Sequence, residues 1–202
     1  MCMRRVLICC VILIVWFTGG YAGDGKYAMS RGSVMISGRG GFNSQFGDRD
    51  PMNPLRKFYF SPSVMYFLND NFAAGIEGVT EKLDYENVSA TAISVGPALG
   101  IFMGAADADV KPYAGCGFHY YHGKVEDYSE LKLNGYEIVL GLGGMRMVSD
   151  DVGISGQFMY AHQAINSKRR IYYPELNEYT TVEHDETGNV FSLAVGLNFF
   201  IF

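Results

Sequence analysis

The feature that most constrains this chain is an alternation of side chains with period two, which recurs in eight separate segments. In each segment one face is bulky and apolar, while the other carries glycine, alanine, serine or an isolated charged residue. Alternation of this kind indicates β-strands. The segments cover residues 33–43, 58–68, 72–80, 90–103, 111–121, 133–148, 152–161 and about 190–202.

The pairing of a bulky apolar face with a small or polar face predicts which side of the sheet meets lipid. A narrow barrel that spans a membrane needs apolar residues outside and small or polar residues inside. We therefore predict an all-β fold, an eight-stranded antiparallel up-and-down transmembrane β-barrel. The alternative is a secreted, lipocalin-like barrel that binds a small apolar ligand, and it requires the opposite arrangement, with apolar residues inside.

The first 22 residues have the organisation of a secretory signal peptide. Arg4 and Arg5 precede an apolar run over residues 6–17, and small residues follow at Gly20 and Ala22. A membrane-spanning helix needs about 20 apolar residues, so cleavage near Ala22 is favoured over an anchor. The predicted organisation is a signal peptide over residues 1–22 and a barrel domain over residues 23–202.

Removal of the leader changes the composition. Three of the four cysteines leave with it, so Cys116 remains alone, and we expect it to face lipid as a small apolar group. Loss of Arg4 and Arg5 takes the formal net charge from −5 to −7, which argues against a nucleic-acid partner. The sequence holds no phosphate-binding glycine loop, metal motif or catalytic triad, so we expect no cofactor and no metal.

The predicted connections alternate in length. Those after the second, fourth and sixth strands are short, and they lie at residues 69–71, 104–110 and 149–151. Those after the odd-numbered strands are longer, and the longest runs from about His162 to Thr187. Short turns on one rim and long loops on the other are typical of outer-membrane barrels. This alternation predicts periplasmic termini and four extracellular loops.

Three segments carry a resemblance to a known family: residues 93–100 (ISVGPALG), 111–117 (KPYAGCG) and 192–199 (SLAVGLNF). Together with the leader and the Asp- and Asn-rich turns, they make the chain resemble the small, eight-stranded bacterial outer-membrane β-barrel family. The resemblance covers nearly all of the mature chain, and its motifs identify an architecture. It implies location in a Gram-negative outer membrane and contact with outer-membrane lipids and lipopolysaccharide. It also implies insertion by the barrel-assembly machinery.

The C-terminal residues are similar to the assembly signal of that family. Leu197, Phe199 and Ile201 are in phase with the lipid-facing side of the last strand, whereas Phe202 belongs to the other face. We therefore predict either a β-bulge near Asn198 and Phe199 or a short periplasmic tail after Phe199.

Four ionisable residues fall on the lumen side of the predicted strands, namely Arg39, Glu77, His119 and Glu137. Ionisable groups at membrane depth are costly unless they are paired. An eight-stranded interior is just wide enough to be filled by side chains. We therefore favour a luminal ion-pair network over an ion-conducting pore.

Two candidate sites lie near the predicted outer rim. His162 occupies a position similar to the catalytic histidine of lipid A deacylases, but the matching nucleophile position is Ala164, and Ser167 is too distant in sequence. The basic run Lys168, Arg169 and Arg170 suits lipopolysaccharide phosphates, although an ordinary solvated loop is the favoured interpretation. The acidic residues that follow suggest affinity for divalent cations without ligand spacing for a defined site.

These features favour a monomeric, non-catalytic outer-membrane protein whose loops mediate surface interaction or envelope integrity. A lipid A-modifying hydrolase and a lipocalin-like binding barrel remain the alternatives.

Overall fold

The structure is a computed structural model, and it describes residues 29, 31–47, 57–85, 88–105, 108–126, 131–173 and 178–201. The predicted signal peptide lies outside the described residues. Eight strands account for most of the described chain. They are β1 (Val34–Gly47), β2 (Lys57–Asn69), β3 (Phe72–Tyr85), β4 (Val88–Phe102), β5 (Val110–Glu126), β6 (Leu131–Met147), β7 (Val152–Tyr173) and β8 (Glu178–Ile201).

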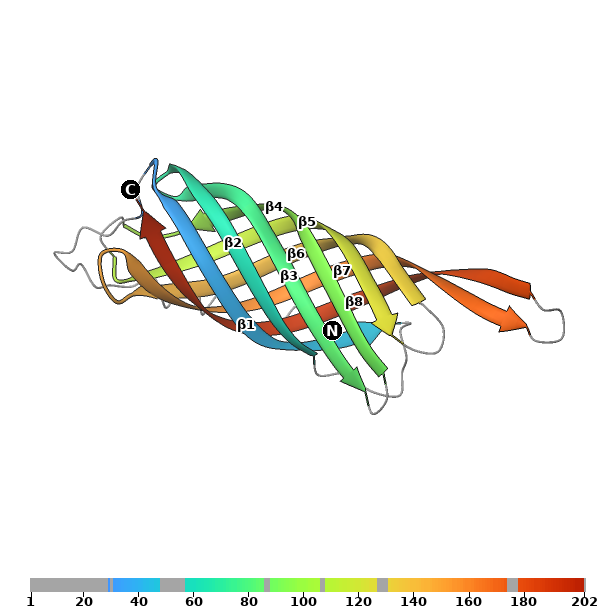
Figure 1. The fold of residues 1–202 in the computed structure, drawn as a ribbon. Coiled ribbons are helices and arrows are strands. Elements are labelled where there is room, and N and C mark those ends of the chain that lie inside the picture. Colours follow the sequence, from blue (N-terminus) through green and yellow to red (C-terminus); the bar gives the residue numbers. More distant parts are fainter. Residues whose placement is uncertain are drawn as a thin grey trace, which may run out of the picture.

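The eight strands form one closed antiparallel barrel in sequence order (Figure 1). Each strand pairs with its neighbours along the chain, and β1 closes the cylinder by pairing with β8 from Val34 opposite Ile201 to Gly47 opposite Gly188. Closure leaves neither edge of the sheet unpaired. The predicted fold class is confirmed. Within the described residues, no helix has the length and apolar character needed to cross a membrane.

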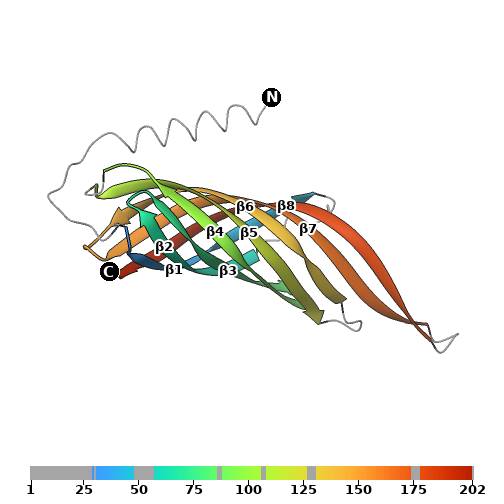
Figure 2. The ribbon, with the colours of Figure 1, turned by 90° about the horizontal axis from the view of Figure 1, so that it is seen from above.

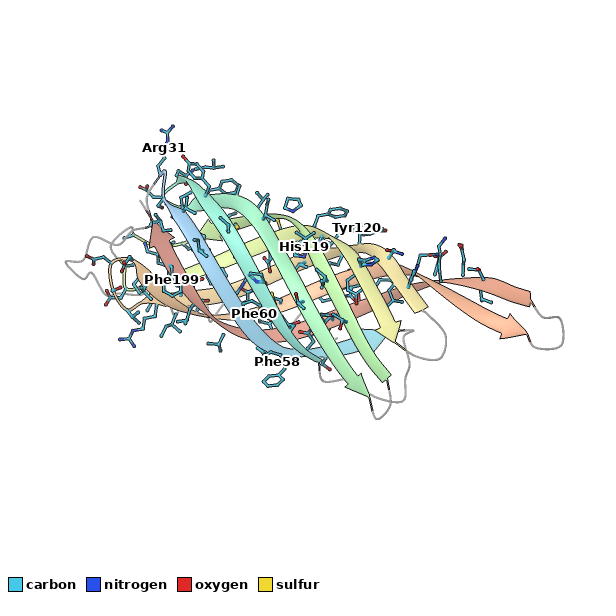
Figure 3. The ribbon with its side chains drawn as sticks, viewed as in Figure 1. Arg31, Phe58, Phe60, His119, Tyr120 and Phe199 are labelled. Carbon is cyan, nitrogen blue, oxygen red and sulfur yellow. The ribbon has the colours of Figure 1, made fainter. Side chains whose placement is uncertain are left out.

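Large apolar side chains cover the outward face of every strand. The most exposed include Phe42 and Leu193, both at 66%, and Val195 at 67%, and Figure 3 shows Phe58 and Tyr120 projecting from the wall. Many inward positions are small or polar, among them Ser61, Ser94 and Ser155, but near the tight turns they are filled by methionine and phenylalanine. This sidedness is the one predicted from the sequence and contradicts the lipocalin-like alternative.

The tight turns are fixed by short polar side chains. Asn69 Oδ1 accepts hydrogen bonds from the backbone N–H groups of Asn71 and Phe72, each at 2.9 Å, which is an Asx turn. At the turn after β6, Ser149 Oγ donates to Asp151 Oδ1 at 2.8 Å. We call this rim, which also holds the C-terminal end of β8, the turn end, and the opposite rim the hairpin end.

The prediction of a long loop from His162 to Thr187 is wrong. β7 continues to Tyr173 and β8 begins at Glu178, so most of this segment is a β-hairpin. Figures 1 and 2 both show it extending beyond the other strands at the hairpin end. The apolar alternation stops where the belt of outward apolar residues ends, but backbone pairing does not require apolar side chains. The other long loops are also shortened by strands that run further than predicted, leaving residues 48–56, 86–87 and 127–130 as connections.

The predicted bulge near Asn198 and Phe199 is absent. β8 stays in unbroken register with β1 up to Ile201, and Phe199 and Ile201 face outward while Phe200 is buried in the lumen. Phe199 therefore does not end the strand, which excludes a tail beginning there. Phe202 lies outside the described residues. An irregularity in register occurs instead in β2, between Phe67 and Asn69, next to the first tight turn.

Candidate functional site

The lumen holds an ion pair between Arg39 of β1 and Glu77 of β3. Arg39 Nη2 lies 2.7 Å from Glu77 Oε1, and both side chains are 11% exposed. Arg39 Nη1 donates to Gln157 Oε1 at 2.6 Å, and Ser61 Oγ donates to Glu77 Oε1 at 2.8 Å. Tyr113 OH donates to the same Gln157 oxygen at 2.6 Å. These five residues, which we call the arginine layer, connect β1, β2, β3, β5 and β7 across the barrel.

A second polar group lies nearer the hairpin end. His119 Nδ1 is 3.0 Å from Glu137 Oε1, the same oxygen that accepts from Ser94 Oγ at 2.5 Å. Gln163 Nε2 donates to Glu137 Oε2 at 3.0 Å. These four residues form the histidine layer, which connects β4, β5, β6 and β7. The carboxylate of Glu137 is thus surrounded by donors from three other strands, which offsets the cost of burying its charge.

Glycine provides the room for these two large polar side chains. A Cβ at Gly117 would lie 2.7 Å from His119 Nε2, and a Cβ at Gly196 would lie 2.5 Å from Arg39 Cγ. Gly196 is also the register partner of Arg39 across the β1–β8 pair. The small residues on the lumen face are therefore required at particular positions, where an imidazole or a guanidinium crosses the interior.

At the turn end the lumen is closed by apolar side chains. Phe67 packs against Phe102 and Phe200, with ring centroids 5.1 and 6.1 Å apart, and Phe102 stacks toward Tyr113 of the arginine layer at 5.5 Å. We call this buried cluster the apolar plug. Its members are Met29, Met35, Met65, Phe67, Ala73, Ala98, Phe102, Met145, Met147 and Phe200.

Between the plug and the arginine layer lies a cavity of about 60 Å³. Its walls include Met35, Met65 and Met145 on one side and Arg39 and Glu77 on the other. The cavity can therefore accommodate at most a very small guest. The plug was not predicted from the sequence, although its methionines and phenylalanines fall on the inward face of their strands near the turns and so indicate an apolar interior there.

The four predicted luminal residues thus form two separate pairs. Arg39 contacts Glu77, and His119 contacts Glu137, and no hydrogen bond or ion pair joins the two pairs among the described side chains. Each layer joins several strands of the barrel through side-chain hydrogen bonds inside the lumen. Each charged group has an opposite charge or several hydrogen bonds, so the geometry is that of a structural network.

His162 does not lie in a hydrolase-like cluster. It is on the outward face of β7, where its Nδ1 lies 3.0 Å from Asn189 Oδ1. Tyr160 OH donates to the same oxygen at 2.7 Å. Among the described side chains, no serine hydroxyl or carboxylate is bonded to His162. Ala164, the position where a nucleophile would be needed, pairs with Thr187 in the ladder.

The predicted basic run of residues 168–170 is part of β7. Lys168 Nζ lies 2.6 Å from Glu183 Oε1 on β8. The side chains of Arg169 and Arg170 lie outside the described part of the structure. No group of three or more potential metal ligands occurs within the described residues, and Cys116 is exposed on the outward face as predicted.

No protein-family model matches the chain, and no curated protein sequence matches it. Solved structures share its fold. Neisserial surface protein A aligns with a TM-score of 0.64 at 13% identity and covers 84% of this chain and 99% of its own. The outer membrane protein OprG from Pseudomonas aeruginosa aligns with a TM-score of 0.55 at 13% identity, covering 86% and 98%.

Ail, the attachment invasion locus protein of Yersinia pestis, aligns with a TM-score of 0.55 at 11% identity and covers 85% of this chain and 99% of its own. At these identities the similarity is one of fold. The barrel closure, the strand order and the outward apolar belt agree with that similarity. The chain has the fold of the small, eight-stranded bacterial outer-membrane β-barrels.

Proposed function

We propose that the protein is an integral bacterial outer-membrane protein with a non-catalytic role in surface interaction, exerted through its extended hairpins. The observation that carries this proposal is the contrast between the two parts of β7 and β8. Near the turn end their outward faces are apolar, whereas beyond His162 and Asn189 they present Lys168, Glu183 and Asp185 to solvent.

The outward face supports insertion in a membrane. A closed barrel satisfies its backbone hydrogen bonds internally, which is the condition for crossing a bilayer with strands. Monomeric soluble proteins rarely expose a contiguous apolar surface larger than a few hundred Å², whereas here every strand contributes exposed apolar side chains. Lipid is the environment in which this surface is stable. We propose that lipids and lipopolysaccharide surround the belt and that the barrel-assembly machinery inserts the protein as a monomer.

The orientation follows from the two rims. Outer-membrane barrels place short turns in the periplasm and longer segments outside the cell. Two of the turn-end connections are compact and are closed by Asn69 and Ser149, whereas the third runs from residue 103 to residue 109. The hairpin end carries the arm formed by β7 and β8, which extends beyond the other strands (Figure 2). We therefore place the turn end in the periplasm and the arm outside, where it can reach partners beyond the membrane surface.

The filling of the lumen supports a role that does not involve conduction. The apolar plug and the two polar layers occupy successive levels of the interior. An ion that crossed would have to displace Arg39 from Glu77 and then pass between buried phenylalanine rings. Purified protein in planar bilayers should therefore show no discrete conductance, and regular open-channel steps would contradict this part of the proposal.

The orientation can be tested by labelling intact cells with a membrane-impermeant maleimide. The background variant is Cys116→Ser, which removes the cysteine of the barrel wall. Thr181→Cys on the arm should be labelled in intact cells, whereas Asp150→Cys at the turn end should be labelled only after the outer membrane is permeabilised. Both positions are exposed in the structure, so they form a matched pair. Labelling of Asp150→Cys alone in intact cells would reverse the orientation, and recovery in the soluble periplasm would reject the membrane location.

A further inference from the structure

Two neighbouring hairpins carry the same outward side chains in the same register. β5 and β7 each contain a Phe-x-Tyr-x-His run, and β6 and β8 each contain an Asn-x-aromatic run. The histidine of each run lies directly opposite the asparagine of the next strand. The two sets are Phe118, Tyr120, His122, Asn134 and Tyr136, and Phe158, Tyr160, His162, Asn189 and Phe191.

In both sets the asparagine oxygen accepts from the tyrosine and the histidine together. Asn134 Oδ1 is 3.4 Å from Tyr120 OH and 2.7 Å from His122 Nδ1, matching the Tyr160, Asn189 and His162 contacts described above. With its oxygen occupied, the asparagine keeps its amide N–H groups for another acceptor, and the imidazole keeps its Nε2. We call these two clusters the first and second brackets.

The brackets lie where the outward face changes from apolar to polar. Below the first bracket, the rings of Phe118 and Tyr136 stack with centroids 5.8 Å apart at 24°. Tyr120 projects from the wall beside them (Figure 3). At the corresponding level of the second pair of strands, Phe158 and Phe191 also lie 5.8 Å apart. Each bracket therefore joins an aromatic surface suited to acyl chains to a set of polar groups facing the interface.

The charges beyond the two brackets differ. Near the second bracket, Lys168 is paired with Glu183, and Asn166 Nδ2 donates to Asp185 Oδ1 at 2.8 Å. Beyond the first bracket, Lys132 lies opposite Lys124 of β5 on one side and Lys168 of β7 on the other. Like charges directly opposite one another destabilise a sheet. Because Lys168 is already bonded to Glu183, the exposed Lys132, which lies between two other lysines in the register, is the cation that an anion against this face would stabilise.

We propose that the outward face of β5 and β6, at the hairpin end of the apolar belt, binds the phosphate of a lipid headgroup. The ammonium group of Lys132 attracts the phosphate, and the amide N–H groups of Asn134, whose oxygen accepts from Tyr120 and His122, lie just below as donors. The Phe118–Tyr136 stack receives the start of an acyl chain. Acidic residues next to the second bracket repel phosphate and exclude it there. This inference rests on the proposed function, since lipid reaches this face when the barrel is in a membrane.

The test uses the full-length mature barrel folded in an uncharged maltoside detergent and titrated with bisphosphorylated lipid A by calorimetry. A lysine near a lipid phosphate contributes about fivefold in affinity, so Lys132→Gln should weaken binding by about fivefold. His122→Ala should also weaken it, whereas His162→Ala, its counterpart in the second bracket, should not. Arg146→Gln, an exposed cation at the turn end, is the second control.

Three outcomes would overturn the inference: unchanged affinity in Lys132→Gln, equal losses for His122→Ala and His162→Ala, or full competition by free inorganic phosphate. The last outcome would identify a site for a free anion. Heat-modifiable electrophoretic mobility of every variant shows whether the barrel is folded. A wild-type protein without a heat-dependent shift would reject the membrane-barrel proposal itself, so the two failures are distinguishable.

Discussion

The lumen and the β7–β8 arm each contain an ion pair of nearly the same length in opposite surroundings. Arg39 and Glu77 lie 2.7 Å apart with each side chain 11% exposed, whereas Lys168 and Glu183 lie 2.6 Å apart at 49% and 54% exposure. Water screens the second pair and can replace either partner when it is removed. The first pair has no such substitute. Equal distances therefore correspond to very different contributions to stability.

The two pairs also differ in what they connect. Arg39 and Glu77 come from strands that are not neighbours in the sheet, and Arg39 also donates to Gln157 of β7, two strands away on its other side. Lys168 and Glu183 are direct register partners on strands already joined by a continuous backbone ladder. The luminal pair thus adds connections that the sheet lacks, while the pair on the arm repeats one that already exists.

The largest expected effect comes from Arg39→Ala. It leaves the buried carboxylate of Glu77 without its cation, and breaking a buried pair in this way costs about 3–5 kcal/mol. The free energy of unfolding in urea, followed by heat-modifiable mobility in vesicles, measures it. The double variant Arg39→Met with Glu77→Gln removes both charges, so its free energy of unfolding should fall by less than that of Arg39→Ala. A loss for Arg39→Ala no greater than that for Lys168→Gln would remove the distinction between the two pairs.

The apolar plug tests whether uncharged side chains buried in the lumen contribute as much to the free energy of unfolding as the Arg39–Glu77 pair does. Phe67→Ala should lower the free energy of unfolding by about 3 kcal/mol, since truncating a buried phenylalanine leaves a cavity. Phe60→Ala, on the outward face of the same strand, is the control. Acyl chains can fill the space there, so its loss should be smaller. Equal losses would indicate that the plug is not tightly packed.

Gly117→Ala tests the space allotted to the histidine layer. The new methyl group would lie 2.7 Å from His119 Nε2, and such overpacking costs about 1–3 kcal/mol. The control is Gly144→Ala on β6, where a Cβ meets nothing within 4 Å, and the urea midpoint of this variant should stay near that of the wild type. Similar losses in both variants would point to a general need for glycine in these strands.

The smallest expected effect is that of Lys168→Gln. An exposed pair of this kind contributes about 0.5 kcal/mol, and the contribution should fall further between 0.05 and 1 M salt because of screening. A double-mutant cycle with Glu183→Gln isolates the coupling energy. A salt-independent coupling of several kcal/mol would show that the arm is shielded from water.

The sidedness of the barrel was predictable because it depends on a local pattern. Alternate residues of a strand point to opposite faces, so the parity of Phe42, Arg39 and Glu77 is fixed within each segment. The same reasoning placed His119 and Glu137 inside. It was sufficient for the fold class, the strand number and the composition of the outward face, but it did not reveal the apolar plug inside.

The extent of the last hairpin was not predictable in the same way. The alternation that marks a strand in the sequence comes from contact with lipid on one face, and it ends near His162 and Asn189. Beyond that level both faces of β7 and β8 meet polar surroundings, so backbone pairing continues without a hydrophobic signature. The bulge predicted near Asn198 was wrong for a related reason, since the parity of Phe202 says nothing about the register of the preceding residues.

The alternation along each segment is enough to predict eight strands with an apolar outward face. The contacts of Arg39 with Glu77 and of His119 with Glu137, and the place of Lys132 between Lys124 and Lys168, become evident only in the folded barrel. The first result depends on neighbours along one strand. The second depends on the register between strands and on the stagger with which the cylinder closes, because these set which distant residues reach the same level.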